Sequence, residues 1–293
     1  MDFRAIAMGL AFALMWSSAF TSARMIVADA PPLTALAIRF LISGVIGIAI
    51  AFALGQTWRL TRAQWRATFV FGLCQNALYL GLNFVAMQTI EASLAAIVAS
   101  SMPLLVGAIG WAVYGERLPT LGIVGLIAGF VGVAVIMASR ISGGVDLYGL
   151  VLCLVGALAL AVATLSVRGA ASGGNVLMIV GLQMLVGSAV LAVAALFLET
   201  WQVNWTPRLL WAFAYTTIVP GLLATFTWFM LVGRIGAVRA ATFHFLNPFL
   251  GVAIAAVLLD EALGLSDIIG VLVIALGILA VQLSKQQENV SKP

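Results

Sequence analysis

The segment PLLVGAIGWAVYGERLPTLGIVGLIAGFVG at residues 103–132 has a counterpart, PFLGVAIAAVLLDEALGLSDIIGVLVIALG, at residues 248–277. A shift of 145 residues superimposes four landmarks: Pro103 on Pro248, Glu116 on Glu261, Gly125 on Gly270 and Gly132 on Gly277. Nearer the N-terminus the shift is 144, which places Arg39 on Gln183. Self-similarity at a nearly constant shift indicates an internal repeat, so the chain consists of two related halves.

The composition decides what surrounds these halves. Of the 293 residues, 63% are hydrophobic and only 8% are charged. A soluble domain carries roughly 25% charged residues, so the few charges here exclude a soluble protein of this size. A membrane-spanning helix needs about 20 apolar residues, and continuous apolar runs of that length do not fit the alternating strands of a barrel. The sequence therefore predicts an all-α integral membrane protein.

Charges and Pro- or Gly-containing turns divide the chain into ten apolar runs. The predicted spans are residues 4–27, 33–55, 65–87, 93–114, 119–139, 147–168, 176–198, 208–231, 237–259 and 266–284. Five helices per repeat is an odd number, so the second repeat is inverted in the membrane relative to the first. We place the repeats at residues 1–142 and 143–293, the second with a short cytoplasmic tail. The distribution of Lys and Arg places both termini in the cytoplasm.

Motifs at matching places in the two halves carry a family resemblance. They are Trp16-Ser17-Ser18-Ala19-Phe20, Arg39-Phe40, Pro103-Leu104, Gly115-Glu116-Arg117-Leu118, Asn247-Pro248 and Asp260-Glu261-Ala262-Leu263. With them the chain resembles the drug/metabolite transporter superfamily, with two EamA-type repeats, and is similar in particular to YddG-type exporters of aromatic and other amino acids. The resemblance implies a bacterial inner-membrane location and a central cavity lined by helices 1–4 and 6–9. It also implies that helices 5 and 10 pack to the side.

Polar residues in the third span are candidate solute contacts. Gln75, Tyr79 and Asn83 recur every four residues and would share one face of an α-helix. Uncompensated polar groups are costly in hydrocarbon, so this face is expected to look into protein or a wet cavity. It could bind an amino-acid headgroup, or it could hold neighbouring helices together.

Aromatic residues at the same spacing mark the first span. Phe12, Trp16 and Phe20 could line the cavity and stack on a substrate ring, or they could simply pack or face lipid. Trp16 is the preferred contact because Ser17 and Ser18 adjoin it. Trp228, which matches Asn83 in the repeat, is a second candidate cavity wall.

The single histidine, His244, lies within the ninth predicted span. An ionisable residue in the membrane is a functional candidate by default, although it could equally be neutral and bonded to a neighbouring helix. Asn247 follows one turn later. Pro103 and Pro248 are expected to weaken their helices at matching places, which makes both prolines candidate hinges and makes Ser100 and Asn247 further candidate solute contacts.

Arg39 and Gln183, which occupy equivalent positions in the two repeats, are further candidate solute contacts. Arg39 could attract a substrate carboxylate, but its depth favours a side chain that reaches back to the outer headgroups. Gln183, which cannot carry charge, is assigned as a substrate contact.

Residues outside the candidate site are expected to be structural. Glu116 and Glu261 each precede another helix, whose N-terminal dipole favours a carboxylate; a gating pair between Glu116 and Arg117 is the alternative. Gly125 and Gly129 form a small-residue pair that permits close helix contact. We expect the fifth and tenth spans to pack on one another rather than to form a dimer.

No Asp or Glu lies in the middle of a predicted span, which favours facilitative or weakly coupled transport and leaves coupling through His244 as the alternative. The sequence contains no phosphate-binding loop and no arrangement typical of an enzyme or metal site. We therefore expect a monomeric exporter of amino acids that works by alternating access in the lipid bilayer, with no cofactor and no nucleic-acid partner. The alternatives are an exporter of another metabolite or drug, a nucleotide-sugar or phosphate carrier, a membrane-embedded enzyme and a non-transporting scaffold.

Overall fold

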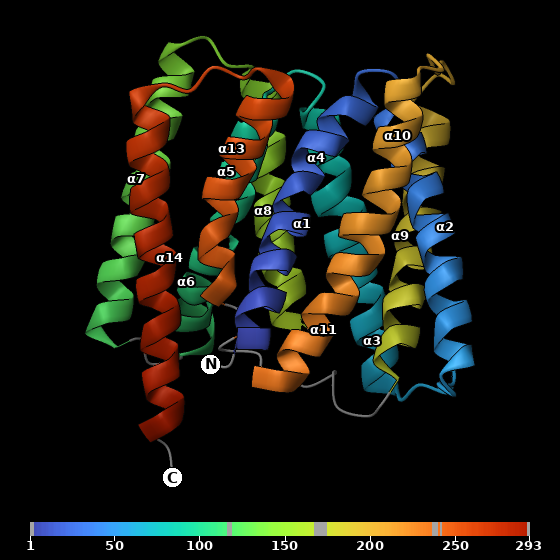
Figure 1. Cartoon of the computed structure of the whole chain (residues 1–293), viewed down its shortest axis with the longest axis horizontal. Coiled ribbons are helices and arrows are strands. Elements are labelled where there is room, and N and C mark those ends of the chain that lie inside the picture. The colour runs from blue at the N-terminus through green and yellow to red at the C-terminus, as the bar shows by residue number, and fades with distance from the viewer. Residues whose placement is uncertain (1–2, 116–118, 167–174, 236–239, 241, 292–293) are drawn as a thin grey trace. The chain divides into compact units, whose positions relative to one another are not determined.

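A computed structural model describes residues 3–115, 119–166, 175–235, 240 and 242–291. Every regular element within these ranges is a helix (Figure 1). The elements of the first predicted repeat are α1 (Phe3–Val27), α2 (Pro32–Ala53), α3 (Arg62–Phe71), η1 (Gly72–Leu80), α4 (Gly81–Ala86), α5 (Ala92–Ser100), α6 (Met102–Tyr114) and α7 (Thr120–Ser142). Those of the second are α8 (Leu147–Ser166), α9 (Val176–Leu198), α10 (Pro207–Thr216), η2 (Thr217–Leu223), α11 (Ala224–Ile235), η3 (Thr242–Leu246), α13 (Asn247–Leu259) and α14 (Leu265–Ser291).

Within the described ranges, nine helices are long and apolar enough to cross a membrane. They agree with nine of the predicted spans to within a few residues. The predicted ninth span, residues 237–259, is the exception. The described apolar helix there, Phe243–Leu259, is shorter, and residues 236–239 and 241 lie outside the described residues. The chain is thus an all-helical, multi-pass membrane protein.

The chain forms two compact units, which do not follow the repeat boundary predicted at residues 142 and 143. Unit 1 comprises residues 1–21, 90–150 and 223–293, and unit 2 comprises residues 22–89 and 151–222. Each unit therefore combines helices from both predicted repeats.

In unit 1 the central contact is between α7 and α14, which lie side by side (Figure 1). A Cβ atom placed on Gly125 would lie 2.8 Å from the carbonyl oxygen of Gly277, and one on Gly132 would lie 3.0 Å from that of Gly270. Only glycine permits backbones to approach this closely. The expected packing of the fifth span on the tenth is confirmed.

In unit 2 the corresponding contact is between α2 and α9. A Cβ on Gly44 would lie 3.0 Å from the carbonyl oxygen of Gly181. Two turns away along α9, the hydroxyl of Ser188 donates to the carbonyl of Ala37 at 2.8 Å. Both units are therefore built around a pair of long helices whose small residues allow close contact.

Side chains from one predicted repeat cap helices of the other. In unit 2, Glu199 accepts hydrogen bonds from the backbone N–H groups of Leu33 and Thr34, while Gln56 accepts one from Met178. In unit 1, Glu261 accepts from the N–H groups of Ala92 and Ser93 at 2.7 and 2.9 Å. Glu261 does meet a helix N-terminus, but it is that of α5 and not that of the helix that follows it. The matching Glu116, with Arg117, lies outside the described residues.

Four interruptions divide the spans. The fourth span breaks at Ser101, between α5 and α6, and Pro103 lies in the first turn of α6. The 3₁₀ helix η3 precedes α13, whose first turn contains Pro248. The predicted weaknesses at both prolines are confirmed. The π-helices η1 and η2 were not predicted, although Pro220 lies inside η2 and cannot donate a helical hydrogen bond.

Candidate functional site

In unit 1, aromatic residues from α1 and α11 converge on His244 in η3. The ring of Phe12 on α1 lies 4.8 Å from that of Trp228 on α11 and 5.4 Å, edge-on, from the imidazole of His244. Trp228 lies 5.2 Å from His244, and Trp16 lies 5.7 Å from Phe12 and 6.5 Å from His244. We call Phe12, Trp16, Trp228, His244 and Asn247 the aromatic–histidine cluster. Phe20, also buried in α1, is not among these ring contacts.

Hydrogen bonds connect the histidine to the polar side of α1. The side-chain Nδ2 of Asn247 lies 2.9 Å from Nδ1 of His244, and the hydroxyl of Ser17 donates to the carbonyl and side-chain oxygens of Asn247 at 3.4 and 3.5 Å. Because the amide Nδ2 can only donate, Nδ1 accepts, and the neutral ring then carries its proton on Nε2. Nε2 is thereby assigned as a hydrogen-bond donor.

Local packing holds the cluster in place. Ala5, Leu231, Ala240 and Phe243 form a buried core against which Trp228 packs. A Cβ on Gly9 would lie only 2.3 Å from the ring of Phe243, so the glycine lets η3 approach α1. The 3₁₀ turn that ends before Pro248 then presents His244 and Asn247 to the aromatic rings.

Burial distinguishes the members of the cluster. Phe12 and Asn247 are buried, as is the neighbouring Ser17, whereas Trp16, Trp228 and His244 are half-buried. The half-buried members offer aromatic faces for stacking and a ring nitrogen for hydrogen bonding. This combination suits a neutral or zwitterionic solute with an apolar or aromatic body.

In unit 2, Tyr79 and Asn83 are buried and linked to α8. The side-chain Nδ2 of Asn83 donates to the carbonyl of Tyr79 at 2.8 Å, and the thiol of Cys153 donates to Oδ1 of Asn83 at 3.4 Å. A Cβ on Gly156 would lie 2.7 Å from Nδ2 of Asn83, so a side chain at residue 156 would require Asn83 to move. These contacts match the interhelical role that the sequence left open for Asn83. Solute contact by Tyr79 and Asn83 stays a prediction.

Gln75 and Gln183 are both half-buried. The face predicted from four-residue spacing assumed an α-helix, but Gln75 and Tyr79 lie in the π-helix η1, in which hydrogen bonds span five residues and each turn is wider. Asn76, the neighbour of Gln75, donates through Nδ2 to the backbone carbonyl of Gln183 at 2.9 Å. This bond does not involve the Gln183 side chain, whose role as a substrate contact stays a prediction.

The hydroxyls at the α5–α6 break bond within their own helix. Ser100 donates to the carbonyl of Ala96 and Ser101 to that of Val98, both at 2.6 Å. Ser100 is 6% exposed. Its hydroxyl hydrogen is thus committed to the backbone, and only its lone pairs remain to accept a bond from a solute.

Arg39 differs from its expectation. Its side chain does not reach outward, because the residue is only 6% exposed and its guanidinium carbon lies 5.2 Å from the centre of the Phe40 ring. The prediction that it extends to the outer headgroups is wrong. Tertiary packing of α2 in unit 2 covers it, which the depth of residue 39 along its span does not reveal.

Acidic residues in the described ranges lie at helix ends. Asp267, in the first turn of α14, is buried and accepts from Arg140 at 2.9 and 3.2 Å, and Arg140 also pairs with Glu91. Among the described residues no group of three metal-ligating side chains comes together.

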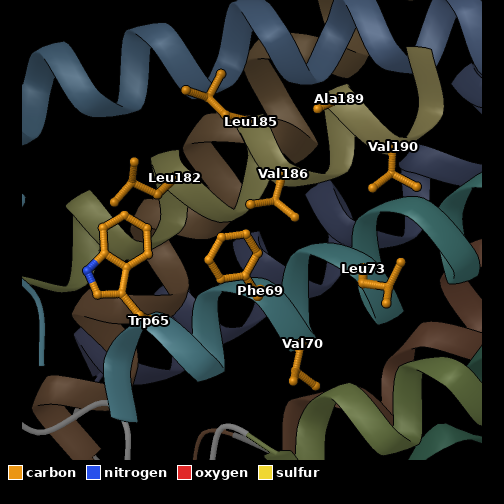
Figure 2. Close-up of a pocket in the computed structure, with 9 residues that line it drawn as sticks. All are labelled: Trp65, Phe69, Val70, Leu73, Leu182, Leu185, Val186, Ala189 and Val190. Atoms are coloured by element: carbon orange, nitrogen blue, oxygen red, sulfur yellow. The ribbon is translucent and has the colours of Figure 1, made fainter. Parts of the chain in front are cut away.

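An apolar groove lies in unit 2, between α3, η1 and α9 (Figure 2). It has a volume of about 540 Å³ and is lined by Trp65, Phe69, Val70, Leu73, Leu182, Leu185, Val186, Ala189 and Val190. None of the predicted site residues lines it. An apolar surface of this kind matches lipid hydrocarbon and offers little to a zwitterion.

Comparison with known proteins identifies the class first: the chain is a membrane transporter. The model of the EamA-like transporter family matches twice, at residues 3–138 and 147–283, so the chain belongs to that family and contains two EamA repeats. It is 28% identical to the uncharacterized transporter YvbV of Bacillus subtilis over 94% of this chain and 90% of that protein. It is 25% identical to the uncharacterized inner membrane transporter YedA of Escherichia coli over 94% and 90%.

A solved crystal structure shares the fold. It superposes with a TM-score of 0.69 at 22% sequence identity and covers 98% of this chain and 100% of its own. Protein PecM of Dickeya dadantii is 25% identical over 90% of this chain and 86% of that protein. None of these relatives has a name that states a substrate, so the solute must be argued from the residues.

Proposed function

We propose that the protein exports amino acids, including aromatic ones, and related small metabolites across a bacterial inner membrane. The aromatic–histidine cluster carries the proposal. α1 and a distant C-terminal region of the chain bring two half-buried tryptophans, a half-buried histidine and a buried asparagine together. Aromatic faces suit an apolar side chain, and the polar atoms beside them suit a zwitterionic headgroup.

Transport proceeds by alternating access between two inverted five-helix repeats, with both termini in the cytoplasm. Reciprocal contacts support this arrangement. If each residue is replaced by its equivalent in the other repeat, the contact between Gly125 and Gly277 becomes a contact between Gly270 and Gly132. Both contacts are present. The same exchange in unit 2 turns the contact of Gly44 with Gly181 into that of Ser188 with Ala37, which also occurs. Such reciprocity is expected of a two-fold axis in the membrane plane.

The hinges are the interruptions at Pro103 and Pro248. A span that is already broken can change its direction with little loss of backbone hydrogen bonding. The coupling is facilitative or weak, because the buried carboxylate of Asp267 is held by Arg140 at a helix end. The protein acts as a monomer on a small-molecule substrate.

A flux assay tests the proposal. Liposomes that contain the purified protein are loaded with one labelled solute at a time: phenylalanine, tryptophan, alanine, a nucleotide sugar or inorganic phosphate. We expect flux of amino acids, aromatic ones included, that follows the concentration gradient and is little altered by an imposed pH gradient. Flux of the nucleotide sugar or phosphate alone would overturn the substrate assignment, and proton-driven accumulation would overturn the facilitative mechanism.

Variants of the cluster test its part in binding. Trp228→Ala removes one aromatic wall, and Trp211→Ala, which removes an exposed tryptophan on α10, is the matched control. We expect the first change to lower tryptophan flux more than alanine flux and the second to alter neither. If Trp228→Ala lowered tryptophan and alanine flux equally, the cluster would not recognise the aromatic ring of the solute.

A further inference from the structure

Two polar residues on one face of α2 are buried without a complete set of partners. Arg39 and Ser43 are four residues apart, so their side chains lie one above the other on the helix. They are 6% and 1% exposed. Nε of Arg39 and Oγ of Ser43 have no hydrogen-bond partner within the described part of the chain.

Such a pair is unusual because buried polar groups in proteins nearly always find partners. A guanidinium is the more demanding of the two, since it is always charged and presents five N–H donors. In the described ranges both ion pairs belong to Arg140, and the Phe40 ring offers Arg39 only a cation–π contact. The side chain therefore has donor capacity that the described residues do not use.

Both side chains converge on the backbone of η2. A Cβ on Gly221 would lie 3.6 Å from Nη2 of Arg39 and 3.5 Å from Oγ of Ser43. Because residue 221 is a glycine, no side chain occupies the position that both polar groups approach. Pro220, the preceding residue, lies inside the π-helix.

The same place in the other repeat is filled. Shifts of 144 and 145 residues relate Arg39 to Gln183, Ser43 to Gly187 and Gly221 to Asn76. There the amide of Asn76 donates to the carbonyl of Gln183 at 2.9 Å. A Cβ on Gly187 would lie 2.4 Å from Cβ of Asn76, so the side chain of Asn76 packs against α9 at the place where η2 has only the glycine at residue 221.

We propose that Arg39 and Ser43 form a subsite for the carboxylate of the transported solute. The guanidinium and the hydroxyl donate hydrogen bonds to the carboxylate oxygens, and the charge-assisted bonds offset the burial of Arg39. Gly221 brings no side chain that would compete for these donors. The inference rests on the proposed function and assigns recognition of the acidic end of the amino acid to unit 2.

Binding is tested with a pair of probes that differ only in charge. Benzoate and benzamide share a ring, but only benzoate carries a carboxylate. The melting temperature of the purified full-length protein in detergent is measured with each probe and with inorganic phosphate, because a ligand that binds the folded state raises it. Arg39→Gln, which installs the residue found at position 183, is compared with Arg39→Lys and with Arg208→Gln, which makes the same change at an exposed arginine.

We expect benzoate to raise the melting temperature of the wild type and of Arg208→Gln but not that of Arg39→Gln, with Arg39→Lys intermediate. Benzamide should give the same small shift in all four proteins. Ser43→Ala keeps the charge of Arg39 and should reduce the rise in melting temperature that benzoate causes. It therefore provides the test if Arg39→Gln fails to fold. A benzoate shift that survives Arg39→Gln, or no shift in the wild type, overturns the subsite. A shift with phosphate equal to that with benzoate would show a general anion site and would also overturn the assignment.

Flux measurements separate this inference from the proposed function. In liposomes, Arg39→Gln should lower phenylalanine flux about tenfold, the effect of losing roughly one charge-assisted hydrogen bond, while flux of phenylalaninamide changes little. If the wild type carries no amino acid, the proposed function fails whatever benzoate does. If the wild type carries phenylalanine and Arg39→Gln carries it equally well, the function stands and the subsite fails.

Discussion

The two π-helices occupy equivalent places in the two repeats and differ in what lies beside them. Against η1, α9 presents a glycine and receives the side chain of Asn76, whose amide bonds to the α9 backbone. Against η2, α2 presents Arg39 and Ser43 and faces the bare backbone at Gly221. The same backbone feature thus meets a hydrogen-bonded amide in one half and two polar side chains without a complete set of partners in the other.

This difference shows that a duplicated fold can present different side chains at matching backbone positions. Transport by inverted repeats needs the two halves to share a backbone so that they can exchange conformations, but a substrate with distinct ends needs different chemistry in each half. In one half Asn76 of η1 faces a glycine, Gly187, on α9. In the other half the glycine is Gly221 of η2, and it faces Ser43 on α2. The two backbones can therefore match while their side chains differ. Four variants break or sharpen the contrast between η1 and η2.

The largest effect is expected at the filled position. Gly187→Val places a branched side chain where a Cβ alone would lie 2.4 Å from Cβ of Asn76. We expect a loss of about 3 kcal/mol of stability, visible as a lower melting temperature and a smaller folded fraction in size-exclusion chromatography. Ala189→Val, at an exposed site on the same helix, should behave like the wild type. Normal stability of Gly187→Val would mean that η1 and α9 are not in close contact.

The next largest effect is expected at Gly221, where η2 has no side chain. Gly221→Asn transfers the side chain of η1 into η2, beside Arg39 and Ser43. The amide should take the position assigned to the carboxylate and lower phenylalanine flux about tenfold, or roughly 1.4 kcal/mol. Gly221→Ala, whose Cβ would lie 3.2 Å from the carbonyl of Thr216, reports the cost of the added carbon alone and should lower flux less. Unaltered flux in Gly221→Asn would contradict the subsite.

A smaller effect is expected from removing the amide of η1. Asn76→Ala eliminates its hydrogen bond to the carbonyl of Gln183, which should cost about 1 kcal/mol of stability. Gln183→Ala is the control, since the acceptor is the backbone and survives the change, and we expect its stability to shift by less than ~0.5 kcal/mol. Melting temperatures of both variants decide the point. A larger loss in Gln183→Ala would show that its side chain, and not its carbonyl, secures η1.

The smallest effect is expected at Pro220. η1 contains no proline and is nevertheless a π-helix, so proline is not required for this conformation. Pro220→Ala should leave η2 a π-helix and change stability by less than ~0.5 kcal/mol. A crystal structure or cryo-EM map of the variant shows which helix type is present. An α-helix at residues 217–223 would mean that the two π-helices have different causes.

Much of the architecture could be predicted from the sequence because hydrophobic length is a strong local signal. Apolar runs located nine spans, and Pro103 and Pro248 located two helix breaks, since a missing N–H acts wherever the residue lies. Of the candidate contacts, Trp16, Trp228, His244 and Asn247 were chosen on separate grounds, and the structure brings them together in unit 1.

Other features had no local signal. The expected face of Gln75 and Tyr79 assumed α-helical spacing, and nothing in residues 72–80 announces a π-helix. Glu261 was expected to meet a helix N-terminus, but the helix it caps begins at Ala92, 169 residues away in the chain. Asn83 meets Cys153 on another helix, and the proximity of two residues so far apart could not be derived from spacing.

The sequence by itself determined that lipid is the solvent, that the chain is helical and that it is duplicated, because each of these follows from composition, run length or self-similarity. The tertiary structure decided which polar groups are satisfied. Arg39 and Asn76 are both polar residues within apolar spans, and their sequence context does not tell them apart. Asn76 has a carbonyl within hydrogen-bond distance, whereas Arg39 faces a glycine. The hydrogen bonding of a buried group depends on the neighbours that packing brings to it.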